Sequence, residues 1–531
     1  MKGAFVSRLA GGLSPRLGIG LAVAAAAGAG LAIGLLPVTS LLVVLGGLLA
    51  IAIVAAILIE PSVGLALTLI AGPFEPLEQV RLGLPIDSGQ ALFALTLGAY
   101  ALRWLSARRS PSAADRAALR EIARFAAPIL VFIGVGVLSF FPATDFRLWL
   151  KECVKWVEIA LMLTLVALEA RAPGRRRLIL GAILIVAAGE ALFGVYQFAL
   201  RQAGPVEFAL PGGRFYRASG TLEQPNPYGG YMGLSWPIAF ALGITWLREP
   251  WRRIRSRDWR GVLTAPGPAL AGLAALLVSI ACVGGLLASW SRGAWIGAAA
   301  AGAAMLIAMS GRPGRALLAV VAGAVIVVAL WQFGLLPTAI VSRLSEFTTQ
   351  FDFSNIDVRG AYLTAANFSL IERLAHWQAA LGMILDHPWL GVGFGNYGAA
   401  YEQYRTLRWA NPLGHAHNYY LNIFAETGIL GLLAYLGVWV AIVVQALRAA
   451  GRRNAPALRL MAIGLLGAVA HLSAHHLFDN LYVANTFLLI GAYLGLFAGA
   501  RLEPVGQAAP DSSISEATST GFAGDVASED K

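Results

Sequence analysis

The sequence HAHNYYLNIFAETGILGLLAYLGVWVAIVV, residues 415–444, places a polar, histidine-bearing opening directly before a long apolar run. A run of this length can cross a bilayer as a helix, and the apolar segment 418–447 is predicted as one span. Ionisable side chains are costly at a bilayer boundary, so those that stand there indicate a functional site. The candidate side chains of this opening are His415, His417, Asn418 and Glu426.

The composition of the whole chain is that of a polytopic membrane protein. Of its 531 residues, 58% are hydrophobic and 13% are charged, and the mean hydropathy is +0.68. A soluble core does not need so many uninterrupted apolar segments close to the roughly 20 residues that cross a bilayer. Cys153 and Cys282, the two cysteines, lie in or beside apolar segments, which favours neither a disulfide framework nor a cysteine-based zinc site.

We therefore expect an all-α polytopic integral membrane protein with roughly 12–14 transmembrane helices. Residues 1–335 are predicted to hold helices 1 to about 11, residues 336–417 one large external loop with amphipathic helices, and residues 418–501 the C-terminal helices. The apolar run at 17–37 resembles a secretory signal, but it is long and a second run follows at once, so we interpret it as a retained first span. Residues 502–531 are too polar to bury a core and predict a disordered cytoplasmic tail.

Arginine is distributed unevenly between alternate connections. If the N-terminus is cytoplasmic and each segment crosses, the cytoplasmic connections hold most arginines, including Arg252 and Arg253 in one and Arg448 and Arg452 in another. This is the positive-inside pattern, and it places both termini in the cytoplasm. The net charge of +11 then reflects topology and attraction to anionic membrane lipids, and it requires no nucleic-acid partner.

Three connections on the predicted external face carry arginine against this bias. One holds Arg214 and Arg217, a second reads Ser289-Trp-Ser291-Arg292-Gly293, and the third is the long segment 336–417. Arginine at a helix mouth suggests an anionic ligand, because a guanidinium donates two parallel hydrogen bonds to phosphate or carboxylate. The alternative is an arginine that only anchors the helix end.

The long external segment contains two predicted amphipathic helices. Asn367 to Leu385, which includes Arg373, has helical spacing and stops before a proline, and Tyr397 to Arg408 has an aromatic belt that suits a membrane surface or sugar rings. The glycine-rich stretch 391–395 between them looks like a phosphate cradle, but no strand precedes it. A tight turn between two helices accounts for these glycines.

The last external turn holds His475, His476 and Asp479. These side chains, joined by His415 and His417, could bind a metal ion. We favour hydrogen-bonded interfacial residues instead, because the chain contains neither a Glu-x-x-His pair nor an Asp-x-Asp motif.

Four motifs on the predicted external face together resemble the O-antigen ligase/polymerase superfamily. In chain order these motifs are Arg217-x-x-Gly-x-x-x-x-Pro-Asn226, Ser289-x-Ser-Arg-Gly293, Arg373-x-x-x-Trp closing in Pro-x-x-Gly-x-Gly393, and His415-x-His-Asn followed by Leu-x-x-x-x-Glu-x-Gly428. The resemblance covers residues 210–435 best. It implies a GT-C-like membrane glycosyltransferase that uses a polyprenyl-diphosphate-linked glycan as donor.

Such a transfer needs a base for the acceptor hydroxyl and fixed positive charge for the departing diphosphate. The resemblance implies His417 as the base, and histidine suits this role because its ordinary pKa is about 6.5. The alternative for His417 is a helix N-cap or a structural hydrogen bonder. The remaining candidates are Arg292 and Arg217 as the diphosphate clamp, Arg214 and Arg373 as second choices, and Asn418, Glu426, Asn226 and Ser291 as substrate-binding or orienting residues. No metal and no cofactor are expected.

The resemblance implies a bacterial cytoplasmic (inner) membrane protein with its active site on the periplasmic side. The acceptor is a glycan, a lipid or a protein, and the sequence does not distinguish a ligase from a polymerase. A transporter or flippase of lipid-linked sugars is the alternative, but it should place charges near mid-span, where Glu190 is a rare candidate. A structural scaffold is a third class, and it predicts no dependence on His417.

Overall fold

The computed structural model describes residues 41–82, 87–107, 113–201, 204–210, 213–336, 338, 341, 343, 358–364 and 367–502. Over these residues the chain is helical, and an isolated bridge between Ala209 and Tyr216 is its only strand-like pairing. Seven of the described helices are long and apolar enough to cross a membrane, by length and composition. The predicted all-α polytopic fold is confirmed. The predicted first span at 17–37 and the predicted tail from Glu503 onward lie outside the described residues.

The seven candidate spans lie in α7 (Ala113–Leu138), α9 (Pro173–Tyr196), α12 (Gly267–Ala288), α13 (Arg292–Met309), α14 (Pro313–Gln332), α18 (Tyr419–Ala449) and α19 (Pro456–His475). Two shorter apolar helices are α3 (Leu41–Ile59) and α20 (Thr486–Arg501), and three further long helices are α6 (Ser88–Ala107), α8 (Phe146–Glu169) and α10 (Pro225–Arg255). The other elements are α4 (Pro61–Ala71), η1 (Gly72–Phe74), α5 (Glu75–Leu82), η2 (Gln197–Arg201), η3 (Val206–Phe208), η4 (Gly220–Leu222), α11 (Trp259–Thr264), α16 (Phe368–Asp386) and α17 (Tyr397–Tyr404). The number of spans, 12–14, stays a prediction.

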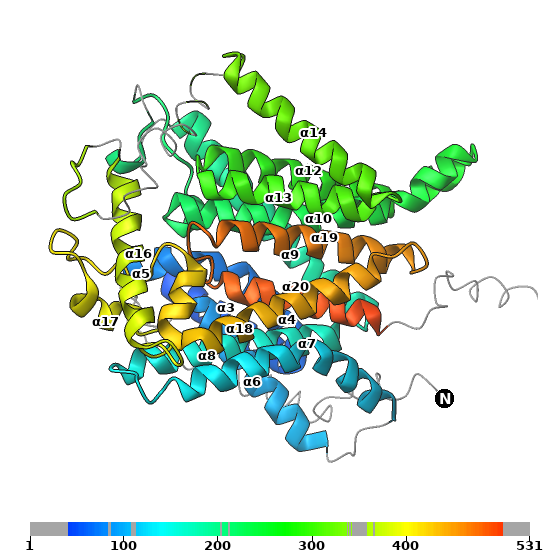
Figure 1. Ribbon diagram of the computed structural model, residues 1–531. Helices are drawn as coiled ribbons and strands as arrows, with labels where there is room; N and C mark the ends of the chain where they lie inside the picture. The colour runs from blue at the N-terminus through cyan, green and yellow to red at the C-terminus, as the bar shows by residue number, and fades with distance from the viewer. Residues whose placement is uncertain are drawn as a thin grey trace, which may run out of the picture.

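The long helices run side by side as one bundle, and α16 crosses one end of it, which we call the α16 end (Figure 1). Within the bundle α10 packs against α12 and α19, and α13 packs against α19. Glycines allow this close approach, because a Cβ on Gly233 of α10 or on Gly297 of α13 would collide with the ring of His471 of α19. The starts of α10 and α13 are therefore held against the end of α19.

The opposite end of the bundle carries arginine-rich helix ends. The last turn of α10 holds Arg252, Arg253 and Arg255, and the last turn of α18 holds Arg448. Both turns lie on the side of the bundle away from α16 (Figure 1). The arginines that the charge pattern assigns to the cytoplasm thus gather at one end.

The two amphipathic helices differ in how well the sequence predicted them. Helix α16 lies within one residue of the predicted Asn367 to Leu385. Helix α17 ends at Tyr404, so its predicted extension to Arg408 is wrong. The reason is that Arg405 is extended, and its guanidinium donates to Glu402 and to the carbonyl of Leu407, which closes a turn instead of continuing the helix.

The predicted span at 418–447 is interrupted inside α18. Gly428 has φ 64° and ψ −169°, which breaks the helix about two and a half turns after its start at Tyr419. The glycine-rich stretch between α16 and α17 fills this break. The N–H groups of Val392 and Gly393 donate to the carbonyls of Ala425 and Glu426, and the N–H of Ile429 donates to the carbonyl of Pro388.

This pairing explains Gly391 in the stretch and Gly428 in α18. A Cβ on Gly391 would collide with the backbone of Glu426, and a Cβ on Gly428 would collide with the backbone of Trp389. Two N–H groups of the stretch are used by the broken helix, which satisfies backbone groups that the break would otherwise leave unpaired. The structure therefore assigns this stretch to docking α16 and α17 onto α18.

Candidate active site

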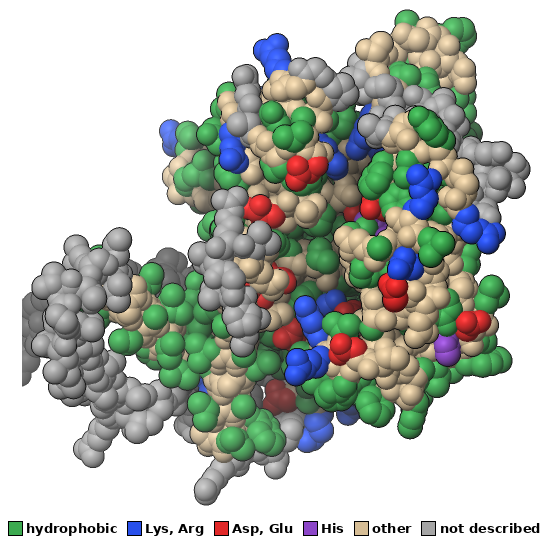
Figure 2. Space-filling model, turned by 90° about the vertical axis from the view of Figure 1, so that its left-hand side faces the viewer, with side chains coloured by type: hydrophobic (Ala, Val, Ile, Leu, Met, Phe, Trp, Pro, Cys, Tyr) green, Lys and Arg blue, Asp and Glu red, His purple; other side chains and the backbone are tan. Residues whose placement is uncertain are grey.

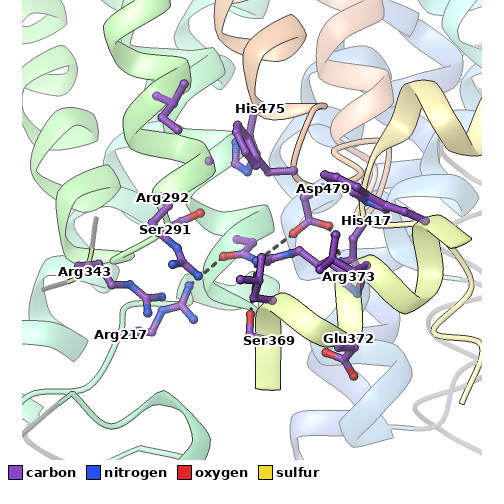
Figure 3. A pocket seen from close by; sticks show the side chains of 17 residues that line it. Arg217, Ser291, Arg292, Arg343, Ser369, Glu372, Arg373, His417, His475 and Asp479 are labelled. Carbon is purple, nitrogen blue, oxygen red and sulfur yellow. Dashed lines mark hydrogen bonds and ion pairs between the residues drawn. The ribbon is translucent and has the colours of Figure 1, made fainter. Parts of the chain in front are cut away.

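A cavity of about 470 Å³ lies at the α16 end. Figure 2 looks onto this end and shows a hollow at its centre with basic and acidic side chains around it. Figure 3 shows the cavity with its lining side chains. The charged and polar lining residues come from the segments at the starts of α10, α13 and α18, from α16, from the segment at the end of α19 and from position 343 beyond α14: Arg217, Asn226, Ser291, Arg292, Arg343, Ser369, Glu372, Arg373, His417, His475 and Asp479.

His417 enters the cavity from a tight turn before α18. Its backbone is left-handed, with φ 51°, and its N–H donates to Nδ1 of His415 at 3.1 Å. Asn418 is the N-cap of α18, because its side chain accepts from the N–H groups of Tyr420 and Leu421. The N-cap alternative for His417 is therefore wrong. Neither ring nitrogen of His417 has a hydrogen-bond partner within the described part of the chain, although both are buried.

Asp479 stands beside His417 at the end of α19. Its Oδ1 lies 3.7 Å from His417 Nδ1 and 3.8 Å from His415 Nε2, and its Oδ2 accepts from Asn226 Nδ2 at 2.9 Å. Burial acts to raise the pKa of Asp479, but the imidazoles of His417 and His415 and the guanidinium of Arg373 lower it more, so its pKa lies below the ordinary range. Asp479 is therefore a buried carboxylate that faces the candidate base.

His415, His417 and Asp479 each offer one ligand atom, and these atoms lie within 4.8 Å of one another, a spacing at which a metal ion could bind. Burial lowers the pKa of His415 to about 4, although Asp479 opposes this shift, so its imidazole is neutral at neutral pH. Because Nδ1 of His415 accepts the N–H of His417, its single ring proton must sit on Nε2, which faces Asp479. A proton on that atom opposes metal binding, since a metal ligand must offer a free lone pair.

His376 of α16 packs behind His417, with ring centroids 5.7 Å apart. Its Nδ1 lies 3.0 Å from the hydroxyl of Tyr397, and its ring stacks on Tyr401. Burial lowers the pKa of His376 to about 3, and the neighbouring His417 and His415 add to this effect. A neutral, aromatic wall thus holds one side of the His417 ring.

Arg217 is held on the other side of Asp479 by a hydrogen-bonded chain. Its Nε donates to the carbonyl of Ser289 at 2.9 Å and its Nη2 donates to Oδ1 of Asn226 at 2.8 Å, while Asn226 in turn donates to Asp479. A guanidinium has five N–H donors, so three remain for a ligand after these two bonds. This chain of hydrogen bonds fixes the distance between the Arg217 guanidinium and Asp479, beside which His415 and His417 lie.

Three more arginines line the same cavity. Arg292 is the first residue of α13, directly after its N-cap Ser291, Arg373 comes from α16, and Arg343 donates to the carbonyl of Trp290. Figure 3 shows Arg217, Arg292 and Arg343 together on one side, with His417 and Arg373 near Asp479. Burial lowers the pKa of Arg217 to about 9, and repulsion from Arg343, Arg373 and Arg292 contributes. Four guanidiniums against the two carboxylates of Glu372 and Asp479 make the lining suited to an anion.

Three predicted site residues do not line the cavity. Arg214 is exposed and lies over the ring of Phe215, with 5.3 Å from its guanidinium carbon to the ring centroid. Asn418 caps α18, and Glu426 is buried in the break of α18, where its Oε1 accepts from the N–H of Tyr397.

The residues of the lining that were not among the predicted site residues include Asp479 and Arg343. Asp479 was considered only as a metal ligand or an interfacial polar residue, and Arg343 was not considered. A carboxylate that follows a His-His pair at the end of a span was the available signal for Asp479.

Residues 275–436 of the chain match one protein-family model, and no match to the chain is found among curated proteins. The matched region, residues 275–436, includes Ser291, Arg292, Arg373 and His417, but it excludes Arg217, Asn226 and Asp479. The resemblance seen in the motifs is confirmed: residues 275–436 match the family model described as O-Antigen ligase, which supports the O-antigen ligase/polymerase superfamily for this chain.

Proposed function

We propose that this protein transfers a glycan from a polyprenyl-diphosphate donor to an acceptor hydroxyl at the external face of the bacterial cytoplasmic membrane. The observation that carries the proposal is that His417, without a hydrogen-bond partner on its ring, and four arginines line one cavity. A base and an anion clamp are the two groups that this reaction needs. The matched family supports a glycosyltransferase of the O-antigen ligase or polymerase type.

In the proposed reaction, His417 takes the proton of the acceptor hydroxyl. The hydroxyl oxygen attacks the anomeric carbon of the donor as the bond between that carbon and the diphosphate oxygen breaks. Nδ1 of His417 faces Asp479, so Nε2 is the atom left to accept the proton. Asp479 stabilises the imidazolium that forms, and Arg217 and Arg292 hold the diphosphate as negative charge develops on it.

This mechanism assigns no step to a metal ion. The leaving diphosphate carries its negative charge into a site that already holds four guanidiniums, which can replace a divalent cation. The proton on Nε2 of His415 also speaks against a metal at the histidine pair. We therefore expect activity in the presence of a chelator.

The distribution of charge supports an external location of the site. The arginine-rich turns of α10 and α18 lie at the end of the bundle away from α16, and the positive-inside rule assigns such turns to the cytoplasm. The α16 end then faces outward, where nucleotides are absent. A donor that already carries a diphosphate leaving group suits that compartment.

The transporter alternative is weaker. It predicted a charged residue near mid-span with a role in transport, and Glu190 was the candidate. In the structure Glu190 accepts two hydrogen bonds from Thr221, in a turn next to Arg217, so its charge has a structural use beside the proposed active site.

The proposal is tested in cells that lack the gene and carry either the wild-type protein or His417→Ala. Surface glycans and lipid-linked glycans are compared on gels. We expect His417→Ala to abolish complementation, because a positioned base contributes about 10²–10⁴-fold to such a reaction. Exported single repeats without long chains indicate a polymerase, and full-length chains left on the polyprenyl carrier indicate a ligase. Full complementation by His417→Ala rejects the enzyme proposal.

A further inference from the structure

Arg217 and Asn226 lie at the two ends of a short connector, residues 217–226, that leads into α10. The connector contains the single turn η4, and Gly220 within it is left-handed, with φ 58°. Both ends line the cavity, but the middle of the connector does not. The position of the Arg217 guanidinium therefore depends on how this turn is fixed.

A buried carboxylate of α9 binds the middle of the connector. Glu190 is 3% exposed, and its two oxygens accept from the backbone N–H of Thr221 at 3.0 Å and from the Thr221 hydroxyl at 2.6 Å. A Cβ on Gly220 would collide with the same carboxylate, so the turn passes directly over it. Glu190 itself does not line the cavity.

Gln197, the first residue of η2 directly after α9, binds the neighbouring part of the connector. Oε1 of Gln197 accepts from the N–H groups of Ser219 at 3.0 Å and of Gly220 at 2.8 Å. Three consecutive N–H groups of the connector are thus bound by two side chains, one from α9 and one from η2. Gln197 also opens the π-helical turn η2, a local widening that occurs often at functional sites.

We propose that Glu190 and Gln197 are positioning residues that hold the connector so that Arg217, which is bound to Asn226, meets the donor diphosphate in the correct place. The inference rests on the proposed function of the cavity. A charged residue buried in a candidate span is costly, and the two hydrogen bonds that Glu190 accepts from Thr221 beside the clamp offset this cost. Gln197 adds three hydrogen bonds to the same turn, two through Oε1 and one from Nε2 to the carbonyl of Gly220. Neither residue contacts the reacting atoms.

The test measures binding of a polyprenyl diphosphate without glycan to the purified full-length protein in nanodiscs. The main variant is Thr221→Val, which keeps the side-chain shape and removes the hydroxyl that lies 2.6 Å from Glu190 Oε1 and 3.0 Å from the carbonyl of Pro73. Glu190→Ala is the second variant, since it also leaves the buried N–H of Thr221 without its acceptor. Thr221→Ser restores the hydroxyl. Thr245→Val is the matched control, because the hydroxyl of Thr245 donates only to a carbonyl within α10.

We expect Thr221→Val to weaken diphosphate binding by about threefold to tenfold, the factor that one lost hydrogen bond is worth. Thr221→Ser and Thr245→Val should bind like the wild type. In the Arg217→Ala background, Thr221→Val should have no further effect, because its influence passes through Arg217.

Two results overturn this inference and leave the proposed function standing, provided that the wild type binds and Arg217→Ala weakens binding. In the first, Thr221→Val and Glu190→Ala both bind like Thr245→Val. In the second, Thr221→Val weakens binding by the same factor with and without Arg217. A wild type that does not bind polyprenyl diphosphate, or whose binding is unchanged by Arg217→Ala, overturns the proposed function and this inference with it. The two failures are therefore distinguishable.

Discussion

Replacing Asp479 with asparagine tests the charge beside His417 with almost no change of volume. In the wild type the carboxylate lies 3.7 Å from His417 Nδ1 and accepts from Asn226 Nδ2 and from the N–H of Asn480, each at 2.9 Å. The amide removes the negative charge that stabilises protonated His417. We expect Asp479→Asn to slow transfer mainly through kcat.

The size of the effect follows from the separation of the two charges. At about 4 Å and an effective dielectric constant of about 20, a carboxylate and an imidazolium attract by about 4 kcal/mol. Each 1.36 kcal/mol is a factor of ten in rate, so complete loss would slow the reaction by about 10³-fold. Neighbouring dipoles replace part of the charge, and we expect kcat to fall by about 10²–10³-fold.

A smaller effect on the donor is expected as well. Whichever way the new amide turns, its NH₂ group faces a donor, either Asn226 Nδ2 or the N–H of Asn480. If Asn226 turns to compensate, its NH₂ group faces Nη2 of Arg217. The KM for the donor should rise by up to about tenfold, the cost of one broken hydrogen bond in the clamp.

The assay uses purified protein in nanodiscs, a polyprenyl-diphosphate-linked glycan and the acceptor that the cellular experiment identifies. Initial rates at varied donor concentration separate kcat from KM. Asp145→Asn is the matched control: Asp145 caps α8 at its partly exposed start, and asparagine is an equally good N-cap. Its kinetics should equal those of the wild type.

The reasoning is refuted if Asp479→Asn keeps more than about one tenth of the wild-type kcat, because the charge would then contribute less than 1.4 kcal/mol. It is also refuted if Asp479→Asn slows the residual reaction of His417→Ala by the same factor as in the wild type. A carboxylate that acts through His417 must lose its effect when the imidazole is removed.

Arg292→Lys should raise the KM for the donor by about 10–100-fold, since lysine cannot donate two parallel hydrogen bonds to a phosphate. Binding of an uncharged glycan should change less. Equal effects on both ligands would contradict the proposed role of Arg292 in holding the diphosphate. Gly391→Ala should lower the apparent Tm by several degrees, because the new Cβ collides with the backbone of Glu426. Gly398→Ala in α17 is the control, since a Cβ has room there. Equal Tm values for the two variants would show that the stretch 391–395 is not tightly packed against α18. Stability should fall as the pH is lowered from about 6.5 toward 4, because burial lowers the pKa of His376 to about 3 and that of His415 to about 4 in the folded protein. The unfolded chain therefore binds protons on these two histidines at a higher pH than the folded chain does. In a series of melting curves over this pH range His376→Phe should lose less stability than the wild type, and an equal loss would exclude His376 as a source.

The sequence predicted the features that depend on local pattern. Apolar length predicted the polytopic all-helical fold, and helical spacing with a closing proline predicted α16 to within one residue. The motif around Ser291 correctly placed Arg292 at a helix mouth, because an N-cap followed by an apolar run is a local signal. These features require no information about distant parts of the chain.

The features that the sequence did not predict depend on contacts between distant segments. The break at Gly428 is stable only because the stretch 388–393 supplies hydrogen bonds to it, and no local pattern near Gly428 contains that partner. Arg214 and Arg217 are equivalent by charge and position, and only the path of the connector separates the exposed residue from the clamp.

The network of the site also extends beyond the region that matches the family. Arg292, Arg373 and His417 lie within residues 275–436, but the hydrogen-bonded chain from Arg217 through Asn226 to Asp479 lies outside it on both sides. This chain joins the start of α10 to the end of α19, and both helices contact α13. The glycines that let α10 and α13 approach His471 therefore help to set the distance between the proposed base, His417, and the proposed diphosphate clamp, because a shift of α19 would carry Asp479 away from both. The geometry of the site thus depends on how the helices pack inside the bundle. A substitution at Gly233 or Gly297 should therefore disturb catalysis, although neither residue lines the cavity.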